Sequence, residues 1–167
     1  MALQSHLMHR VELFTPQSDE ELEATRQIFG EYAGSLGVDL CFQNFDDELA
    51  ALPGEYATPR GALMLARVDG KVVGCCALRP LDTVDYPNAA ELKRLYVRKA
   101  FRRFGLGRKL AECMLDAARV AGYRCVLLDT LHDMEAARQL YVGLGFKDIA
   151  PYYYNPLPGS HYLKVDL

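Results

Sequence analysis

The segment best suited to chemistry is a basic, glycine-containing loop at residues 98–108. Apolar residues typical of a strand precede it and a run with helical spacing follows it, so it is predicted to open a helix. Main-chain N–H groups of a helix's first turn have no partner inside the helix, and the helix dipole adds partial positive charge there. Gly105 and Gly107 would let the backbone approach a ligand closely. The loop is therefore predicted to bind a phosphate or a pyrophosphate.

Two common phosphate-binding motifs do not fit this loop. A P-loop needs a Ser or Thr after a Gly-Lys pair, and the chain has none in that place. The dinucleotide-binding fingerprint needs a third glycine where Leu110 stands. What remains is Arg102-x-x-Gly105-x-Gly107, a strand-loop-helix element with a different glycine pattern.

This pattern resembles the acyl-CoA signature, [Q/R]-x-x-G-x-[G/A], of the GNAT superfamily of acetyl-CoA-dependent N-acetyltransferases. Residues 91–97 look like the strand that precedes the loop in that family. Residues 137–146 resemble its A-x-x-x-Y-x-x-x-G-F element, which joins a helix to a strand. Two motifs in the right order, roughly 40 residues apart, make the resemblance specific, although a motif match is a hypothesis until its structural context is known.

The resemblance implies an N-acetyltransferase that moves the acetyl group of acetyl-CoA to a primary amine by direct attack in a ternary complex. Acetyl-CoA would be a cosubstrate, and no metal is expected. Main-chain groups of residues 95–97 would pair with the pantetheine arm, and one N–H there, at Leu95 or Val97, would polarise the thioester carbonyl. Main-chain groups and arginines of the loop would hold the pyrophosphate. The cofactor-binding residues implied are Leu95, Tyr96, Val97, Arg102, Arg103, Phe104, Gly105, Leu106, Gly107 and Arg108.

The resemblance also implies two catalytic residues, Glu91 and Tyr141. A lysine-like amine has a pKa near 10.4, so its neutral form costs about 4.6 kcal/mol at pH 7, and a base must take its proton. Glu91 matches a general-base position of the family, acting directly or through water, but a surface or salt-bridged glutamate is the alternative. Tyr141 matches the tyrosine that donates to the departing sulfur, and a core tyrosine is its alternative.

Several positions near the expected acceptor site leave alternatives open. Many family members have an asparagine seven residues before the motif tyrosine, where this chain has Met134. His132 and Asp133 could offer another base, or could form a turn and a helix cap. At most two of the three tyrosines at 152–154 are expected to share a face, because side chains alternate along a strand. Acidic residues 46–48 could form a wall that suits a cationic amine.

The predicted elements follow the order β-α-α-β-β-β-α-β-α-β-β. This order predicts an α/β fold with a mixed, mostly antiparallel central sheet, one β-α-β unit and flanking helices, as in the GNAT fold. Asp69-Gly70 is a strong hairpin signal. The strands are expected at 11–15, 62–68, 71–78, 89–97, 124–128, 146–149 and 161–165. The helices are expected at 18–36, 45–52, 105–121 and 135–144.

Composition predicts one domain over residues 1–167, with ordinary hydrophobic and charged contents. Five cysteines without C-x-x-C spacing, no secretory signal and no apolar run long enough to span a bilayer favour the cytoplasm and no membrane partner. Residues 93–109 carry eight Lys or Arg and no acid, which indicates an anionic partner. Nucleic acid is not expected, because the pI is about 5.8 and no nucleic-acid-binding motif occurs.

Three functions fit these observations to different extents. Acetyl transfer to a small-molecule or peptide amine fits best, with the identity of the amine left open. A noncatalytic acyl-CoA-binding sensor or interaction module is the second interpretation, and nucleic-acid binding is a distant third. A homodimer is left open as well.

Overall fold

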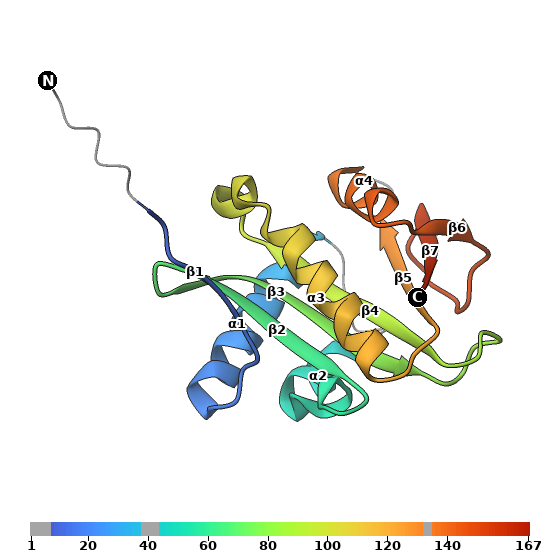
Figure 1. Cartoon of the computed structure of the whole chain (residues 1–167), viewed down its shortest axis with the longest axis horizontal. Helices are drawn as coiled ribbons and strands as arrows, with labels where there is room; N and C mark the ends of the chain where they lie inside the picture. Colours follow the sequence, from blue (N-terminus) through green and yellow to red (C-terminus); the bar gives the residue numbers. More distant parts are fainter. Residues whose placement is uncertain (1–7, 38–43, 132–134) are drawn as a thin grey trace, which may run out of the picture.

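The computed structural model describes residues 8–37, 44–131 and 135–167. A seven-stranded sheet, in the order β1-β2-β3-β4-β5-β7-β6, forms its centre, and helices lie against the sheet (Figure 1). The predicted order of elements and the mixed sheet are confirmed. The strands are β1 Val11–Phe14, β2 Ala62–Val68, β3 Lys71–Leu81, β4 Ala89–Val97, β5 Cys125–Leu131, β6 Lys147–Ile149 and β7 Ser160–Asp166. The helices are α1 Asp19–Ser35, α2 Phe45–Ala51, η2 Gly54–Tyr56, η3 Lys99–Phe104, α3 Leu106–Val120 and α4 Glu135–Gly143.

Local sequence signals set several of these boundaries. Ser18 caps α1 through a capping box, in which its hydroxyl accepts from the Glu21 N–H and the Glu21 carboxylate accepts from the Ser18 N–H. Asp69 and Gly70 both have positive φ, 49° and 82°, which is the backbone of a tight hairpin turn between β2 and β3. β3 and β5 extend beyond their predicted ends, to Leu81 and Leu131.

The sheet has an apolar core on each face. α3 and α4 cover one face, where α3 buries a stripe that includes Leu106, Leu110 and Met114. α1 and α2 cover the other face, where Ile28 and Phe29 of α1 are buried. None of the described helices combines the length and the apolar character that crossing a bilayer requires.

β4 and β5 are parallel neighbours only at their start. The ladder between them joins residues 89–91 to residues 125–127, and Figure 1 shows the two strands separating beyond that point. The β3–β4 ladder also shifts register between Cys75 and Ala77, opposite a bulge at Arg94, whose φ is +61°. A bulge bends its strand and re-aims neighbouring groups. Main-chain groups of β4 beyond Glu91 thus face an opening in the sheet instead of a β5 ladder.

Candidate active site

Two adjoining cavities lie beside β4. The larger, of about 520 Å³, lies between α2, η2, the ends of β3 and β4, and Tyr152 and Tyr153. The smaller, of about 50 Å³, lies where β4 and β5 separate, and its lining includes Leu95, Asp129 and Tyr141. Lys93 lines both cavities, so both border β4 at this residue. The larger cavity has room for a small ligand, and the smaller one marks the place where β4 and β5 separate.

The predicted phosphate-binding loop is formed by η3 and the start of α3. Gly105 has φ +68°, a conformation that other residues adopt only with strain, and a Cβ there would meet no atom of the described residues within 4 Å. Within the described part of the chain no side chain caps the first turn of α3, so its N–H groups are left for another partner. A Cβ on Gly107 would be 3.7 Å from Leu140 Cδ2, which is ordinary contact. The loop therefore fits a pyrophosphate, because its helix start has open space and uncapped donors.

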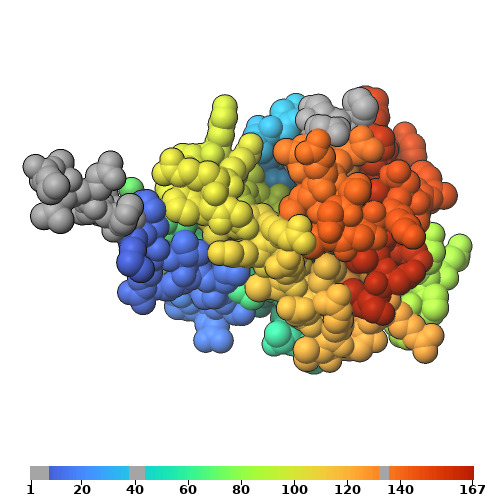
Figure 2. Space-filling model, turned by 45° about the horizontal axis from the view of Figure 1, so that its top comes forward, coloured from blue at the N-terminus to red at the C-terminus, as the bar shows by residue number. Residues whose placement is uncertain are grey.

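The side chains of this loop divide into surface cations and packed apolar residues. Arg102, Arg103 and Arg108 are exposed, as a phosphate contact requires. Figure 2 shows this region of η3 and α3 on the surface beside α4. The side chain of Leu106 is fully buried in the core, so only its main chain can serve the loop. Phe104 stacks on Phe101 with centroids 6.1 Å apart, so its ring is part of the loop's packing.

Acids from elsewhere neutralise much of the basic stretch at residues 93–109. The partners are Glu91 for Lys93, Glu48 for Arg94, Glu31 for Arg98 and Glu112 for Arg108. The stretch therefore carries less free positive charge than its sequence indicates. Three of these acids precede the stretch and one follows it, so the run of residues does not include them. Arg103 lies over the Phe104 ring, and Arg102 Nε donates to the Val97 carbonyl at 3.1 Å.

Of the three β4 residues predicted to pair with the pantetheine arm, Leu95 lines the smaller cavity. Tyr96 points to the α1 side, where its ring meets that of Tyr32 edge-on at 6.1 Å. Val97 is buried in the core under α3. Main-chain groups, and not these side chains, therefore remain the part of the segment suited to hydrogen bonding with a ligand.

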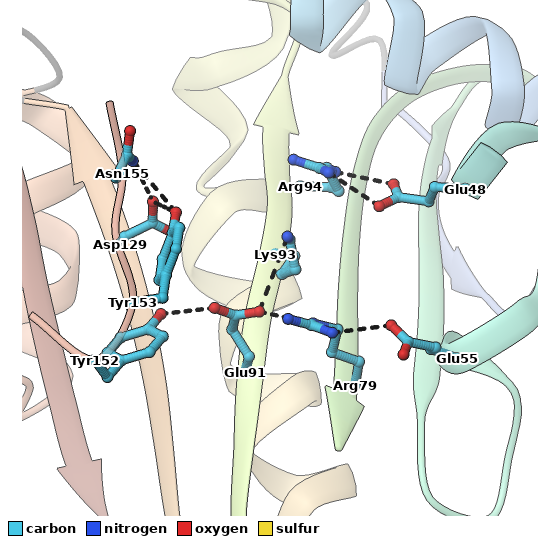
Figure 3. A network of polar contacts seen from close by, with 10 residues as sticks. All are labelled: Glu48, Glu55, Arg79, Glu91, Lys93, Arg94, Asp129, Tyr152, Tyr153 and Asn155. Carbon is cyan, nitrogen blue, oxygen red and sulfur yellow. Dashed lines mark hydrogen bonds and ion pairs between the residues drawn. The ribbon is translucent and has the colours of Figure 1, made fainter. Parts of the chain in front are cut away.

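Glu91 lies in the wall of the larger cavity and is only 2% exposed, so it is not a surface residue. Its Oε1 accepts from Arg79 Nε at 2.7 Å, and its Oε2 accepts from the Tyr152 hydroxyl at 2.7 Å. Lys93 Nζ lies 3.9 Å from Oε1 (Figure 3). Burial and the Glu91 carboxylate raise the pKa of Tyr152. Glu91 is thus a salt-bridged carboxylate that also faces the predicted acceptor space.

Asp129 forms a second polar cluster, on β5 just beyond its ladder with β4. Its Oδ2 accepts from the Tyr153 hydroxyl at 2.5 Å and from Asn155 Nδ2 at 3.0 Å (Figure 3). Burial raises the pKa of Asp129, and the nearby Glu91 charge raises it further. Asp129 therefore provides a half-buried carboxylate at the smaller cavity, held by two hydrogen-bond donors.

Tyr141 lies in α4 and lines the smaller cavity. Its side chain is 6% exposed, and its ring meets that of Phe146 at 5.5 Å between centroids. Burial raises the pKa of Tyr141 well above its usual value. The phenol therefore stays protonated and can donate a hydrogen bond. Its packing fits a core tyrosine, and its position in the cavity wall fits a tyrosine that donates to the departing sulfur.

Some sequence predictions about the acceptor side need correction. Asp47 and Glu48 line the larger cavity but Asp46 does not, and Glu48 is committed to Arg94. Tyr152 and Tyr153 both line this cavity, whereas Tyr154 is 86% exposed, so two of the three tyrosines share one side. His132, Asp133 and Met134 lie outside the described residues.

Three charged residues of the site were missed by the sequence reasoning: Arg79, Lys93 and Asp129. The alternation of faces along β4 could have placed Lys93 beside Glu91. Arg79 could have been found only from the register, in which it lies directly opposite Glu91. Asp129 lies toward the end of a buried strand, and an acid in that place is a signal that was available in the sequence.

Comparisons with known proteins identify the family and the fold. Residues 22–146 match the model of the acetyltransferase (GNAT) family. An uncharacterised N-acetyltransferase of Schizosaccharomyces pombe is 37% identical over 149 residues, which cover 89% of this chain and 90% of the relative. A GNAT acetyltransferase structure from Staphylococcus aureus Mu50 aligns with a TM-score of 0.77 at 19% identity, covering 94% of this chain and 99% of that one.

A second solved structure resembles the fold closely. YncA of Salmonella typhimurium, solved with acetyl-CoA as its cofactor, aligns with a TM-score of 0.72 at 19% identity and covers 93% of both chains. At such identities these two structures support the fold, while the family model and the yeast relative identify the family. The chain therefore belongs to the acetyltransferase (GNAT) family and is an N-acetyltransferase.

Proposed function

We propose that this chain is a single-domain enzyme, over residues 1–167, that transfers the acetyl group of acetyl-CoA to a primary amine. The amine binds in the 520 Å³ cavity and attacks directly, in a ternary complex. The observation that carries the proposal is that the larger cavity borders β4 beside the opening between β4 and β5, with Lys93 lining both it and the smaller cavity. An acceptor site next to the cosubstrate site is what direct transfer between two bound substrates requires.

Acetyl-CoA would supply the reactive thioester. In the proposal, main-chain N–H groups of residues 103–108 hold its pyrophosphate, assisted by the exposed arginines 102, 103 and 108. Main-chain groups of residues 95–97 hold the pantetheine arm, and the N–H of Leu95 or Val97 donates to the thioester carbonyl. The uncapped start of α3, the open space around Gly105 and the acetyl-CoA bound to YncA support this assignment.

Glu91 and Tyr141 are the proposed catalytic side chains. Glu91 takes the amine's proton, directly or through a water molecule, because its buried carboxylate faces the larger cavity. Its bonds to Arg79 and Tyr152 fix its orientation and leave lone pairs on both oxygens. Tyr141 donates a hydrogen bond toward the departing sulfur from the wall of the smaller cavity.

The larger cavity suits a small-molecule amine better than an amine on the surface of another protein. Its volume of about 520 Å³ lies within the roughly 300–1,000 Å³ usual for small-molecule sites. A noncatalytic CoA-binding module would have no use for a buried carboxylate in a second cavity. We also propose a cytoplasmic location, which the free cysteines 75, 76, 113 and 125 support.

Calorimetric titration with acetyl-CoA and with desulfo-CoA tests the cosubstrate site. We expect micromolar binding that Gly107→Glu abolishes, because the side chain would enter the space beside the start of α3. Gly30→Glu is the matched control, since Gly30 is a helical glycine in α1 where an added Cβ would meet no atom of the described residues within 4 Å. Absence of binding at millimolar acetyl-CoA would overturn the proposal.

A thiol-release assay with a panel of amines then tests transfer. Glu91→Gln is expected to lower kcat about 10²-fold or more with unchanged acetyl-CoA affinity. An unchanged kcat in this variant would remove Glu91 from the mechanism. Binding of acetyl-CoA without thiol release from any amine, amino acids included, would favour the noncatalytic interpretation.

A further inference from the structure

Two adjacent tyrosines, Tyr152 and Tyr153, bind the acids at the place where β4 and β5 separate. The Tyr152 hydroxyl donates to Glu91 Oε2 at 2.7 Å, and the Tyr153 hydroxyl donates to Asp129 Oδ2 (Figure 3). Glu91 is the last β4 residue of the β4–β5 ladder, and Asp129 lies on β5 just beyond the end of that ladder. One segment, between β6 and β7, therefore contacts both strands at the opening.

An aromatic cluster holds Tyr152 in place. Its ring centroid lies 5.4 Å from that of Tyr153 and 5.4 Å from that of Tyr162, which it meets edge-on. Tyr162 belongs to β7, where it is the register partner of Asp129 on β5. Edge-to-face ring contacts add stability beyond the area that they bury. The ring of Tyr152 is thus anchored on the sheet, so its hydroxyl has a defined place beside Glu91.

The Glu91 carboxylate is held from two sides. Arg79 Nε donates to Oε1 at 2.7 Å, and Lys93 Nζ lies 3.9 Å from the same oxygen. Tyr152 donates to Oε2 instead, and Figure 3 shows Arg79 and Tyr152 on opposite sides of the carboxylate. The last torsion of a glutamate side chain is soft, so a carboxylate bound at one oxygen alone could turn about it. The bond at Oε2 fixes the plane of the carboxylate.

Tyr152 acts on Glu91 as a neutral donor. Burial, followed by the charges of Glu91 and Asp129, raises the pKa of Tyr152, so the phenol stays protonated. A hydrogen bond donated to a carboxylate favours its charged form. Only the charged form of a carboxylate can take a proton from an amine. The bond therefore orients Glu91 and also favours the form that a general base needs.

We propose that Tyr152 is a positioning residue for acetyl transfer, acting through Glu91 by fixing its carboxylate and favouring its charged form. The inference rests on the proposed function, since Glu91 is the base proposed there. It goes beyond that function because it gives a task to a segment that lies outside both sequence motifs.

Tyr152→Phe tests the inference, because it removes the hydroxyl and keeps the ring. We expect kcat to fall about tenfold or more, because the base is no longer held in its productive orientation. KM for the amine and the affinity for acetyl-CoA should change little, since the phenylalanine ring preserves the cavity wall. Thiol release and calorimetric titration measure these quantities.

Tyr162→Phe is the matched control. It removes a hydroxyl from the same aromatic cluster, but that hydroxyl donates to the Tyr153 carbonyl at 3.2 Å and not to Glu91. The control should keep the kcat of the parent. Equal losses of kcat in the two variants would show that the cluster as a whole matters, and would overturn the inference.

The pH profile of kcat provides a readout that a purely structural tyrosine would not move. Its acidic limb reports protonation of the base in the complex with both substrates. Loss of a hydrogen bond to the charged form should move the acidic midpoint of Tyr152→Phe upward by about one pH unit. An unmoved midpoint would contradict the inference.

Other ionisable groups surround Glu91 and stay in place in this variant. They are the cations Arg79 on β3 and Lys93 on β4, the acids Asp129 on β5 and Glu55 in η2, and the phenol of Tyr153. The substitution therefore changes no charge near Glu91, and a moved midpoint reports the lost hydroxyl.

A double-mutant cycle with Glu91→Gln separates this inference from the proposed function. Tyr152→Phe should have little further effect on kcat in the Glu91→Gln protein, because residues that act as a unit are not additive. The same fold loss in both proteins would overturn the inference and leave the proposed function intact. An unchanged kcat in Glu91→Gln would overturn the inference together with the role of Glu91, although thiol release would still show transfer. No thiol release from any amine would overturn the proposed function itself and the inference with it.

Discussion

The guanidinium of Arg94 on β4 and the carboxylate of Glu48 on α2 form a two-armed ion pair, with both N–O distances 2.9 Å. Arg94 is the residue at the β4 bulge, with φ +61°, and its side chain also lies over the Phe45 ring. The pair therefore ties α2, which walls the larger cavity, to the strand that faces the opening between β4 and β5. Side-chain exposures of 3% and 15% show that this pair is largely shielded from water.

Glu48→Gln should lower the free energy of unfolding by about 3 kcal/mol, because it leaves the Arg94 charge buried without its counterion. Urea unfolding monitored by circular dichroism measures this change. Glu112→Gln is the control, since its pair with Arg108 is 55% and 48% exposed and is worth at most about 0.5 kcal/mol. Equal losses in the two variants would show that the Arg94 pair contributes no more than a surface pair.

The two loop glycines should respond differently to alanine. Gly107→Ala should leave stability unchanged or raise it by about 0.5 kcal/mol, because the protein has room for the methyl group and alanine favours a helix. Its affinity for acetyl-CoA should fall about tenfold or more, because the methyl group occupies space beside the ligand. Gly105→Ala should instead cost about 1 kcal/mol of stability, because φ +68° is strained for alanine.

Calorimetry and urea unfolding of both variants separate these effects. A Gly107→Ala protein that binds acetyl-CoA as tightly as the parent would show that no ligand approaches this part of α3.

Most of the fold could be predicted because its signals are local. The Ser18 capping box, the Asp69-Gly70 hairpin and the apolar stripe of α3 each depend on residues a few positions apart. The cofactor loop is also one continuous segment, so its motif is visible in the sequence. Side chains alternate along a strand, and the neighbours Cys75 and Cys76 accordingly lie in different core clusters.

The acceptor side could not be predicted as fully because it is assembled from distant segments. Arg79 meets Glu91 through strand register, and Glu48 meets Arg94 across 46 positions. Acids 46–48 were interpreted as one wall, yet the structure commits Glu48 to Arg94. A run of basic residues does not show which of them form ion pairs with acids elsewhere in the chain. For residues 93–109, the sequence therefore overestimated the free positive charge.

Asp129→Asn should stabilise the protein at pH 7. Burial raises the folded-state pKa of Asp129 above its unfolded value near 3.8, so the folded state disfavours the charged form at pH 7. That cost is fully present above the folded pKa and vanishes below the unfolded pKa, where both states are protonated. The gain from asparagine should therefore shrink as the pH falls toward 4. Both donors meet Oδ2, so an amide oxygen in that place keeps both hydrogen bonds.

Urea unfolding at pH 7 and pH 4 measures this difference, and Asp116→Asn, at an exposed position, is the control. Destabilisation at pH 7, or the same gain at both pH values, would contradict a raised pKa of Asp129 in the folded state.

Tyr141→Phe should lower kcat about 10²-fold without changing acetyl-CoA affinity, because it removes the donor proposed to face the departing sulfur while keeping the ring packed on Phe146. Burial raises the pKa of Tyr141, so its neutral form stabilises the folded state fully below pH 10 and that contribution is lost as the pH rises further. The variant should therefore lose less stability above pH 10 than the parent. Steady-state kinetics and urea unfolding at two pH values check both effects, with the exposed Tyr154→Phe as control. An unchanged kcat would reduce Tyr141 to a packing residue.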